Sequence, residues 1–453
     1  MDLVTKATNY IKENKKKIDP TFRSKFHMEP TVGWLNDPNG LIYFGRKFHL
    51  FYQQNPYNSL PGDMGWGHFI SRDLIKYREI DTCMYPDGFE KGECGCWTGS
   101  SFVESGEMKL VYTRHYDGRG MFPNVQTQHL VTTQDNIKYT KHETPLINND
   151  EMPENLSRAD FRDPQIFYYF GTCVMIIGCQ NENKDGVFVV YTGPNSSSLH
   201  YSFHFGPFKN TERMVECPSF IRIGNKDVII YSSFKFDGTN GVYYLIGQLD
   251  LLHRTFLVEG EGELDGGDAF YAPKVIENYK YPTLIGWMDN WNKKYPTNEY
   301  GHGYAGAFTI PRILEIKNNM LYQKIHPNLY KYIVDEKQVE NNGCIDRLSI
   351  NLVEFCSDFQ IIVEGENGKF CINKYKDDIY LSMQCANNMH KDEHKSKFKY
   401  STGKLTFLLD TSSIELFIDD GKETISTRFY VLGEKYKIRM EGIDKFTSKT
   451  LKI

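Results

Sequence analysis

One turn-and-hairpin pattern recurs five times along the middle of this chain, and it restricts the fold more than any other feature. Each copy has a short turn motif, an apolar stretch, a turn with Gly or polar residues, and a second apolar stretch, which is the pattern of a β-hairpin. The copies begin with DPNG at Asp37, WTGS at Trp97, DPQI at Asp163, ECPS at Glu216 and YAPK at Tyr271. Repetition at a near-fixed period is typical of repeat architectures.

The spacing of the copies indicates how much chain each unit holds. The intervals are 61, 65, 54 and 55 residues when the anchors are Pro38, Gly99, Pro164, Pro218 and Pro273. A unit of this length holds about four short strands, which is the size of a propeller blade. The sequence therefore predicts a five-bladed β-propeller over residues 20–330. A β-sandwich with similar hairpins is the alternative, but it would not explain the near-constant spacing.

The segments on either side of the repeats have different patterns. Residues 1–19 place Leu3, Ala7, Tyr10 and Ile11 on one helical face, which predicts a short amphipathic helix that docks on the body. Residues 335–453 alternate apolar and polar positions with turn signals between them, which predicts a β-sandwich domain. The expected fold class is therefore all-β, with a five-bladed propeller, a C-terminal β-sandwich and one short N-terminal helix.

Composition excludes several functional classes. The net charge of −5 leaves no basic excess for nucleic acid. The N-terminal segment has no apolar run long enough for a signal peptide or a membrane span, so we expect no membrane association and a cytoplasmic location. Ten cysteines in a chain of 453 residues are too sparse for a disulfide scaffold, and reduced thiols are expected.

No metal site is expected from the cysteine and histidine pattern. The ECGC stretch from Glu93 to Cys96 has no second Cys/His pair at zinc spacing. The HKDEHK stretch from His390 to Lys395 is interpreted as a solvated turn.

Three acids lie at the repeated turn motifs: Asp37, Asp163 and Glu216. Equivalent positions of successive blades face one central axis, so we expect these side chains to meet at one mouth of the channel. Like charges in one pocket raise each other's proton affinity, a cost that is tolerated mainly at functional sites. Paired carboxylates in an aromatic-lined cleft indicate cleavage of a glycosidic bond.

The local sequence suggests a different role for each of two acids. Asp37 lies among turn donors and next to Asn36, which should keep it ionised, so it is the expected nucleophile. Glu216 lies between Val215 and Cys217, an apolar setting that favours the protonated form, so it is the expected acid/base.

The third acid has an arginine beside it. Arg162 should hold Asp163 ionised, and a permanently charged carboxylate can accept hydrogen bonds from sugar hydroxyls. A purely structural Arg–Asp pair is the alternative. The candidate sugar contacts around the three acids are Asn36, Gln53, Trp66, Trp97, Thr98, Arg162 and Tyr271.

The motifs together resemble glycoside hydrolase family 32, the group of invertases, sucrose-6-phosphate hydrolases and fructanases. WLNDPNG resembles its nucleophile motif, FRDP its transition-state-stabiliser motif and EC followed by Pro its acid/base motif. FYQQNP, WGH, WTGSS, FYAP and GWM follow in the family's order. The resemblance implies a propeller plus a sandwich, and retaining hydrolysis of terminal β-fructofuranosides through a covalent fructosyl–enzyme. It also implies that Asp37 is the nucleophile, Asp163 the transition-state stabiliser and Glu216 the acid/base, with no cofactor.

Three positions depart from the family pattern. Ala269 stands where the family usually has Asp, Lys274 stands where Gln is common, and Tyr304 replaces a usual Trp. All three are expected in the fifth blade, so they leave recognition of the leaving group open. Lys274 is a candidate phosphate contact.

Sucrose or sucrose 6-phosphate is the expected substrate. An exo-acting fructanase on inulin- or levan-type oligosaccharides, and a fructosyltransferase using the same intermediate, are the alternatives. A non-catalytic sugar-binding propeller is an alternative from a different functional class. Association of copies through the β-sandwich is left open.

Overall fold

The computed structural model describes residues 2–86, 92–118, 123–234, 238–291, 293–376, 378–385, 393–397 and 403–453. The HKDEHK stretch lies outside the residues whose side chains are described. Within the described ranges, no helix is both long enough and apolar enough to cross a membrane.

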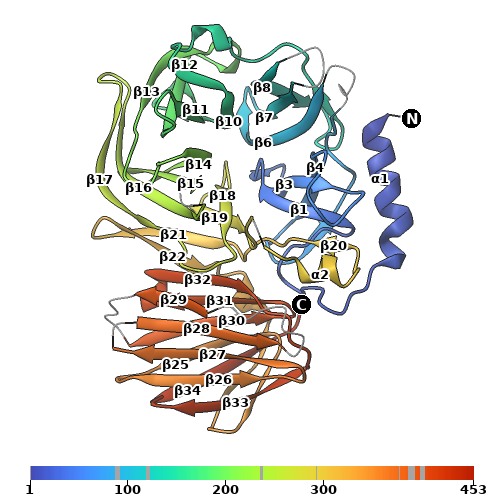
Figure 1. Ribbon diagram of the computed structural model, residues 1–453, viewed down its shortest axis with the longest axis vertical. Coiled ribbons are helices and arrows are strands. Elements are labelled where there is room, and N and C mark those ends of the chain that lie inside the picture. Colours follow the sequence, from blue (N-terminus) through green and yellow to red (C-terminus); the bar gives the residue numbers. More distant parts are fainter. Residues whose placement is uncertain are drawn as a thin grey trace.

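Five sheets follow one another between Gly33 and Ile325 in the described part of the chain, and Figure 1 shows them arranged around a common centre. The first contains β1 (Gly33–Pro38), β2 (Ile42–Phe44), β3 (Lys47–Asn55), β4 (Gly65–Ser71), β5 (Tyr77–Glu79) and β20 (Tyr304–Ala305). The second contains β6 (Glu93–Glu104), β7 (Glu107–Asp117), β8 (Asn124–Thr133) and β9 (Tyr139–Lys141). The third contains β10 (Leu156–Tyr169), β11 (Thr172–Asn181), β12 (Gly186–Gly193) and β13 (His200–Phe205).

The remaining two sheets have the same antiparallel order. The fourth contains β14 (Met214–Ile223), β15 (Lys226–Phe234), β16 (Asn240–Asp250) and β17 (Thr255–Glu263). The fifth contains β18 (Tyr271–Val275), β19 (Thr283–Trp287), β21 (Arg312–Lys317) and β22 (Met320–Ile325). Strand β20 returns from the fifth sheet and pairs in parallel with β1, so the last sheet is tied to the first.

A second domain of two six-stranded sheets follows, and it lies below the propeller in Figure 1. One sheet contains β23 (Ile333–Gln338), β25 (Ser349–Glu354), β30 (Lys404–Asp410), β31 (Ser413–Ile418), β32 (Glu423–Arg428) and β34 (Lys445–Leu451). The other contains β24 (Cys344–Asp346), β26 (Phe359–Glu364), β27 (Gly368–Tyr375), β28 (Asp378–Cys385), β29 (Glu393–Lys397) and β33 (Lys435–Glu441). Alternate residues such as Ile361, Val363, Phe370 and Ile372 fill its core, as period-2 alternation requires. The expected fold class, a propeller followed by a β-sandwich, is confirmed.

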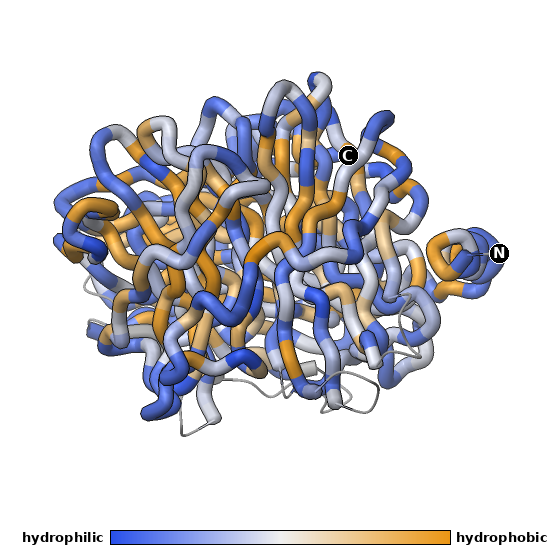
Figure 2. Tube along the Cα trace, turned by 90° about the horizontal axis from the view of Figure 1, so that it is seen from above, coloured by the Kyte–Doolittle hydropathy of each residue, from blue (hydrophilic) through white to orange (hydrophobic). Residues whose placement is uncertain are grey.

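The N-terminal helix α1 (Leu3–Asn14) is capped by the Asp2 carboxylate, which accepts from the Thr5 amide. Ala7 and Ile11 of its predicted apolar face are buried. Figure 2 shows the helix at the edge of the molecule, and shows apolar stretches running through the strands. The short helices are α2 (Pro296–Glu299), η1 (Lys15–Lys17), η3 (Asn149–Glu151), η4 (Ser196–Ser198), η5 (Leu329–Tyr332) and η6 (Asp419–Gly421).

A buried charge network joins the two domains. His27 lies between two sandwich acids, with Nδ1 2.9 Å from Asp410 Oδ2 and Nε2 2.6 Å from Glu415 Oε1. Burial by itself lowers the pKa of His27, but the hydrogen bonds to Asp410 and Glu415 outweigh burial and raise it to about 9. Arg312 bridges Glu415 and Asp265, at 2.9 Å from Asp265 Oδ2. Because each buried charge has a partner of opposite sign, the network favours one docking geometry over looser ones.

Candidate active site

A cavity of about 310 Å³ lies where the innermost strands of the five sheets meet. It is lined by Asn36, Asp37, Gln53, Pro61, Gly62, Met64, Trp97, Thr98, Arg162, Asp163, Glu216, Phe234, Tyr271 and Trp291. All three predicted acids and six of the seven predicted sugar contacts therefore line one cavity. The sequence prediction that the acids converge is correct as a matter of geometry.

A β-bulge in each innermost strand brings these side chains to the cavity. The pairing register shifts between Leu35 and Pro38, Trp97 and Gly99, Arg162 and Gln165, Glu216 and Ser219, and Tyr271 and Lys274. In three of these bulges a non-glycine residue has a positive φ: 66° at Asp163, 52° at Cys217 and 48° at Ala272. Bulges bend a strand and re-aim its side chains, and strained backbone of this kind clusters at functional sites.

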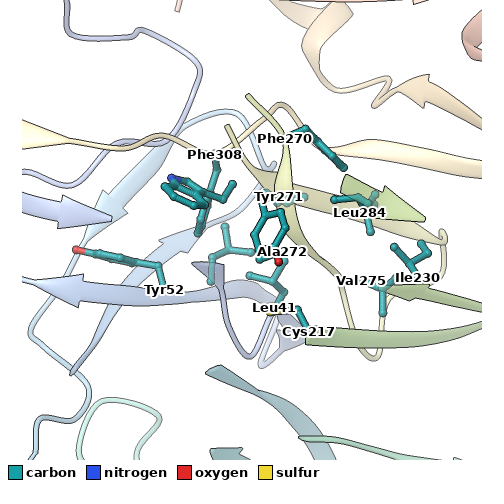
Figure 3. Packing of buried hydrophobic residues seen from close by; sticks show 14 of the residues in the cluster. Leu41, Tyr52, Cys217, Ile230, Phe270, Tyr271, Ala272, Val275, Leu284 and Phe308 are labelled. Atoms are coloured by element: carbon teal, nitrogen blue, oxygen red, sulfur yellow. The ribbon is translucent and has the colours of Figure 1, made fainter. Parts of the chain in front are cut away.

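The bulge register corrects the expected equivalence of the three acids. Asp163 lies inside its bulge, whereas Glu216 is the residue just before its bulge. Glu216 is therefore equivalent to Arg162, and the residue equivalent to Asp163 is Cys217. Figure 3 shows Cys217 near Tyr271 and Ala272 of the fifth sheet, in one apolar cluster with Leu41.

Asp37 is held by two neighbouring side chains. Its Oδ1 accepts from Asn36 Nδ2 at 3.0 Å, and its Oδ2 accepts from Thr98 Oγ1 at 2.6 Å. Burial is the main reason that the pKa of Asp37 rises to about 6, and the charges of Asp163 and Glu216 raise it further against these hydrogen bonds. The expectation that turn donors dominate is therefore wrong, because desolvation outweighs them. The ionised form still predominates at pH 7.

Asp163 of the third sheet takes its contacts from the second and fourth sheets, which lie on either side of it. Its Oδ2 accepts from the Cys217 amide at 2.8 Å, and its own amide donates to Thr113 Oγ1 at 2.9 Å. The Cys217 thiol lies 3.4 Å from Asp163 Oδ2 and 3.5 Å from Asp37 Oδ2, so it links the two acids. Burial raises the pKa of Asp163, while the charges of Arg162 and Lys274 lower it.

Glu216 has a polar setting, contrary to the expectation from its apolar sequence neighbours. Arg162 donates to Glu216 Oε1 from Nε at 3.0 Å and from Nη2 at 2.8 Å, and the Tyr271 hydroxyl donates to Oε2 at 2.6 Å. Arg162 also lies 3.2 Å from Asp160 Oδ1. The predicted Arg162–Asp163 side-chain pair is replaced by an Arg162–Glu216 pair between neighbouring sheets.

The aromatic residues divide between the cavity wall and the core. Trp97 stacks on His115 with ring centroids 3.8 Å apart and lines the cavity. The prediction that Trp66 contacts the sugar is wrong, because Trp66 is fully buried behind the wall and donates from Nε1 to Trp97 O. Trp291, which the sequence reasoning missed, lines the cavity from the segment after β19. The repeated turn motifs do not include this position, so their pattern carried no signal for it.

The three departures from the family pattern do not line the cavity. Lys274 is buried and donates from Nζ to Pro218 O at 2.9 Å, so its expected role as a phosphate contact is wrong. Tyr304 lies in β20 of the first sheet, not in the fifth, and packs under the Arg23 guanidinium. Ala269 is buried in a small cluster with Met288 and Ala307.

Asp268 lies at the contact between the two domains. Asp268 pairs with Lys293 and accepts from Thr427 Oγ1 at 2.7 Å, so it joins the two domains.

Among the described residues, no group of three or more His, Cys, Asp or Glu side chains is arranged to hold a metal ion.

Comparisons with known proteins agree with this geometry. The family model for the glycosyl hydrolases family 32 N-terminal domain matches residues 27–325, and the C-terminal model of the same family matches residues 338–450. The chain is 28% identical to a sucrose-6-phosphate hydrolase of Escherichia coli over 96% of this chain and 94% of that protein. It is 28% identical to an E. coli raffinose invertase over 89% of each.

A solved structure is similar over almost the whole length. A mutant of the Bombyx mori GH32 beta-fructofuranosidase in complex with sucrose matches with a TM-score of 0.89 and 25% identity, over 99% of this chain and 98% of that one.

Proposed function

Because this chain belongs to glycoside hydrolase family 32, we propose that it is a retaining glycosidase that releases fructose from terminal β-D-fructofuranosides such as sucrose or sucrose 6-phosphate. The observation that carries this proposal is the meeting of Asp37, Asp163 and Glu216 in one cavity, each with its own hydrogen-bond partners. A cavity of about 310 Å³ suits one sugar ring with part of a second.

The first step would transfer the fructosyl unit to Asp37. The carboxylate of Asp37 attacks the anomeric carbon, and Glu216 donates a proton to the departing glycosidic oxygen as the bond to that carbon breaks. Thr98 and Asn36 orient the attacking carboxylate. Asp163 is placed to accept hydrogen bonds from the sugar hydroxyls and to stabilise positive charge on the ring in the transition state.

The second step would release fructose. Glu216, now ionised, takes a proton from a water molecule, whose oxygen attacks the anomeric carbon and displaces the Asp37 carboxylate. Arg162 and Tyr271 hold the Glu216 carboxyl through both steps. Because two displacements occur at the same carbon, the released sugar keeps the β configuration.

Initial rates and product stereochemistry test the proposal. We expect fructose release from sucrose, sucrose 6-phosphate or 1-kestose in side-by-side assays, with slower release from inulin and levan. Proton and carbon NMR of the first turnovers should show β-fructofuranose before mutarotation. First appearance of the α anomer, or no fructose release from any of these substrates, would contradict the proposal.

A second cavity favours a phosphorylated substrate. It has a volume of about 410 Å³ and is lined by Asp160, Arg162, Gln180, Lys184, Arg213, Met214 and Phe234. It shares Arg162 and Phe234 with the main cavity. The leaving group must lie beside Glu216, and Glu216 pairs with Arg162, which lines both cavities. Because Arg162 is engaged by Glu216 and Asp160, Lys184 and Arg213 are the two cationic side chains that suit a phosphate group on the leaving sugar.

Neutral substitutions in this second cavity separate the two substrates. Arg213→Gln and Lys184→Gln should each raise KM for sucrose 6-phosphate by about tenfold, because a charge-assisted hydrogen bond is lost. KM for sucrose should change little. Arg254→Gln, on the turn between β16 and β17 and in neither cavity, is the matched control. Equal effects on both substrates would argue against a phosphate site here.

A further inference from the structure

Lys274 is a buried cation of the fifth sheet that the mechanism above does not use. Lys274 lies in β18 with only 3% of its surface exposed, and its Nζ donates to Pro218 O at 2.9 Å. Pro218 and Cys217 form the bulge of β14, directly after Glu216. A buried ammonium group is costly unless negative charge lies close to it. The burial of this cation against the bulge of β14 therefore calls for an explanation.

The groups that interact with the Lys274 ammonium come from three strands and from the segment after β18. They are Asp37 of β1, Asp163 of β10, Cys217 of β14 and Glu277 after β18; burial lowers the pKa of Lys274, and the charges of these groups act against burial. Cys217 gives the geometric link, because it precedes Pro218 and its thiol lies 3.5 Å from Asp37 Oδ2 and 3.4 Å from Asp163 Oδ2. Glu277 is held at 2.5 Å by Gln165 Nε2 from β10, and burial raises its pKa to about 7. The negative charge around Lys274 thus includes two of the three acids proposed for the reaction.

The other cation at the cavity is already engaged. Arg162 pairs with Glu216 and Asp160 and forms no hydrogen bond with Asp37 or Asp163 that the structure shows. Positions equivalent to Lys274, just after the bulge, hold the neutral Gln165 in β10 and Ser219 in β14. A lysine at this position is therefore not required by the bulge geometry.

A purely structural role explains the position of Lys274 less well. Its hydrogen bond ties β18 to β14, but other bonds already connect these sheets. The Val275 amide donates to Ser219 Oγ at 3.0 Å, and the Ala272 amide donates to Ser232 Oγ at 2.9 Å. The strands would stay attached without the ammonium group.

We propose that Lys274 is a positioning residue for the reaction, whose buried positive charge offsets the repulsion between Asp37 and Asp163 and keeps both carboxylates ionised during turnover. The proposal rests on the function proposed above, in which Asp37 is the nucleophile. Three carboxylates and one guanidinium line the cavity, and the buried ammonium group of Lys274 brings the local charge closer to zero. Removing it leaves two acids to repel each other in a desolvated site.

The sign of the effect on pH dependence follows from these charges. Lys274 lowers the pKa of Asp163 and stabilises the ionised form of Asp37. Loss of this cation therefore raises the pKa of both acids. More of the nucleophile is then protonated at a given pH. The acid limb of the kcat/KM profile therefore moves to higher pH, on the order of one unit for a partly buried charge pair.

The test compares Lys274→Gln with the wild-type enzyme between pH 4.5 and 8.5. Gln keeps a donor for Pro218 O but has no charge, and Lys274→Met removes both. We expect the acid limb to move upward by about one pH unit in both variants. Lys374→Gln is the matched control, because Lys374 of the sandwich is also 3% exposed and paired with an acid. It should leave the profile unchanged.

Thermal unfolding gives a second readout that does not depend on activity. As the pH rises from 4.5 to 8, the buried carboxyl groups of the folded chain lose their protons. Their ionisation costs more free energy when the charge of Lys274 is absent. The Tm gap between wild type and Lys274→Gln should therefore widen over this range, whereas the gap for Lys374→Gln should not. A pH profile that superimposes on wild type, together with a constant Tm gap, would overturn the proposal. Absence of fructose release by the wild-type chain would overturn the proposed function instead.

Discussion

Asp37→Ala is expected to lower kcat for fructose release by at least about 10⁴-fold, because the group proposed to form the covalent intermediate is absent. The fold should persist, since Asp37 accepts three side-chain hydrogen bonds, from Asn36, Thr98 and the Cys217 thiol, within a ring of paired strands. The measurement is single-turnover and steady-state fructose release, with Tm as a check on folding. Turnover within tenfold of wild type would rule out Asp37 as nucleophile.

A small external anion distinguishes a nucleophile from a residue with another role. Azide can enter the space left by Asp37→Ala and attack the anomeric carbon from the same face. Only one displacement then occurs, so the product should be the α-fructosyl azide. Asp163→Ala is the matched control, because its carboxylate lies in the same cavity but is not proposed to attack. Azide should not restore its activity.

The pKa of Asp37 also sets the pH dependence of the wild-type enzyme. Burial and the neighbouring acids raise this pKa to about 6, and only the ionised form attacks. Activity should therefore fall as pH drops through about 6 and should level off above it. For stability the sign is opposite: the folded state favours protonated Asp37, so this contribution is present below about pH 4 and is lost as pH rises through about 6. Asp37→Asn should accordingly be at least as stable as wild type at pH 8.

Glu216→Gln is expected to lower kcat on sucrose by about 10²- to 10⁴-fold, because the departing oxygen receives no proton. An aryl β-fructofuranoside, whose leaving group needs little protonation, should retain much more of its fructosylation rate. The basic limb of the pH profile should flatten, since the group that must stay protonated is gone. The carbonyl oxygen of Gln can still accept from Arg162, and its NH2 group can donate to the Tyr271 hydroxyl oxygen, so the cavity shape should be kept.

The leaving-group comparison is the internal control for this variant. An equal fold-loss of rate on sucrose and on the aryl β-fructofuranoside would indicate that Glu216 orients the sugar without transferring a proton. A basic limb identical to that of wild type would contradict the acid/base role in the same way.

Much of the architecture could be predicted from the sequence. The five hairpin copies and the alternating pattern after residue 335 predicted a propeller followed by a sandwich, because strand periodicity and turn chemistry are local properties. The convergence of Asp37, Asp163 and Glu216 also followed from the repeat, since equivalent segments of a radial fold face the same centre.

The errors concern what lies next to each side chain in space. Trp66 was expected at the sugar but lies behind the wall, because it belongs to β4, which β3 separates from the innermost strand β1. Lys274 was expected to meet a phosphate but reaches inward to Pro218. Trp291 was missed because the segment that carries it lies outside the repeated motif.

The sequence by itself determined the succession of sheets, the two-domain plan and which three acids gather at the centre. Only the tertiary structure decided their partners and their charge states. Arg162 is adjacent in sequence to Asp163, yet its side chain crosses to Glu216, 54 residues away. Asp37 lies among turn donors, yet burial and two distant acids raise its pKa. The physical reason is that hydrogen-bond pairing, desolvation and Coulomb interaction depend on distances through space. The five bulged strands fix these distances only when the ring of sheets has closed.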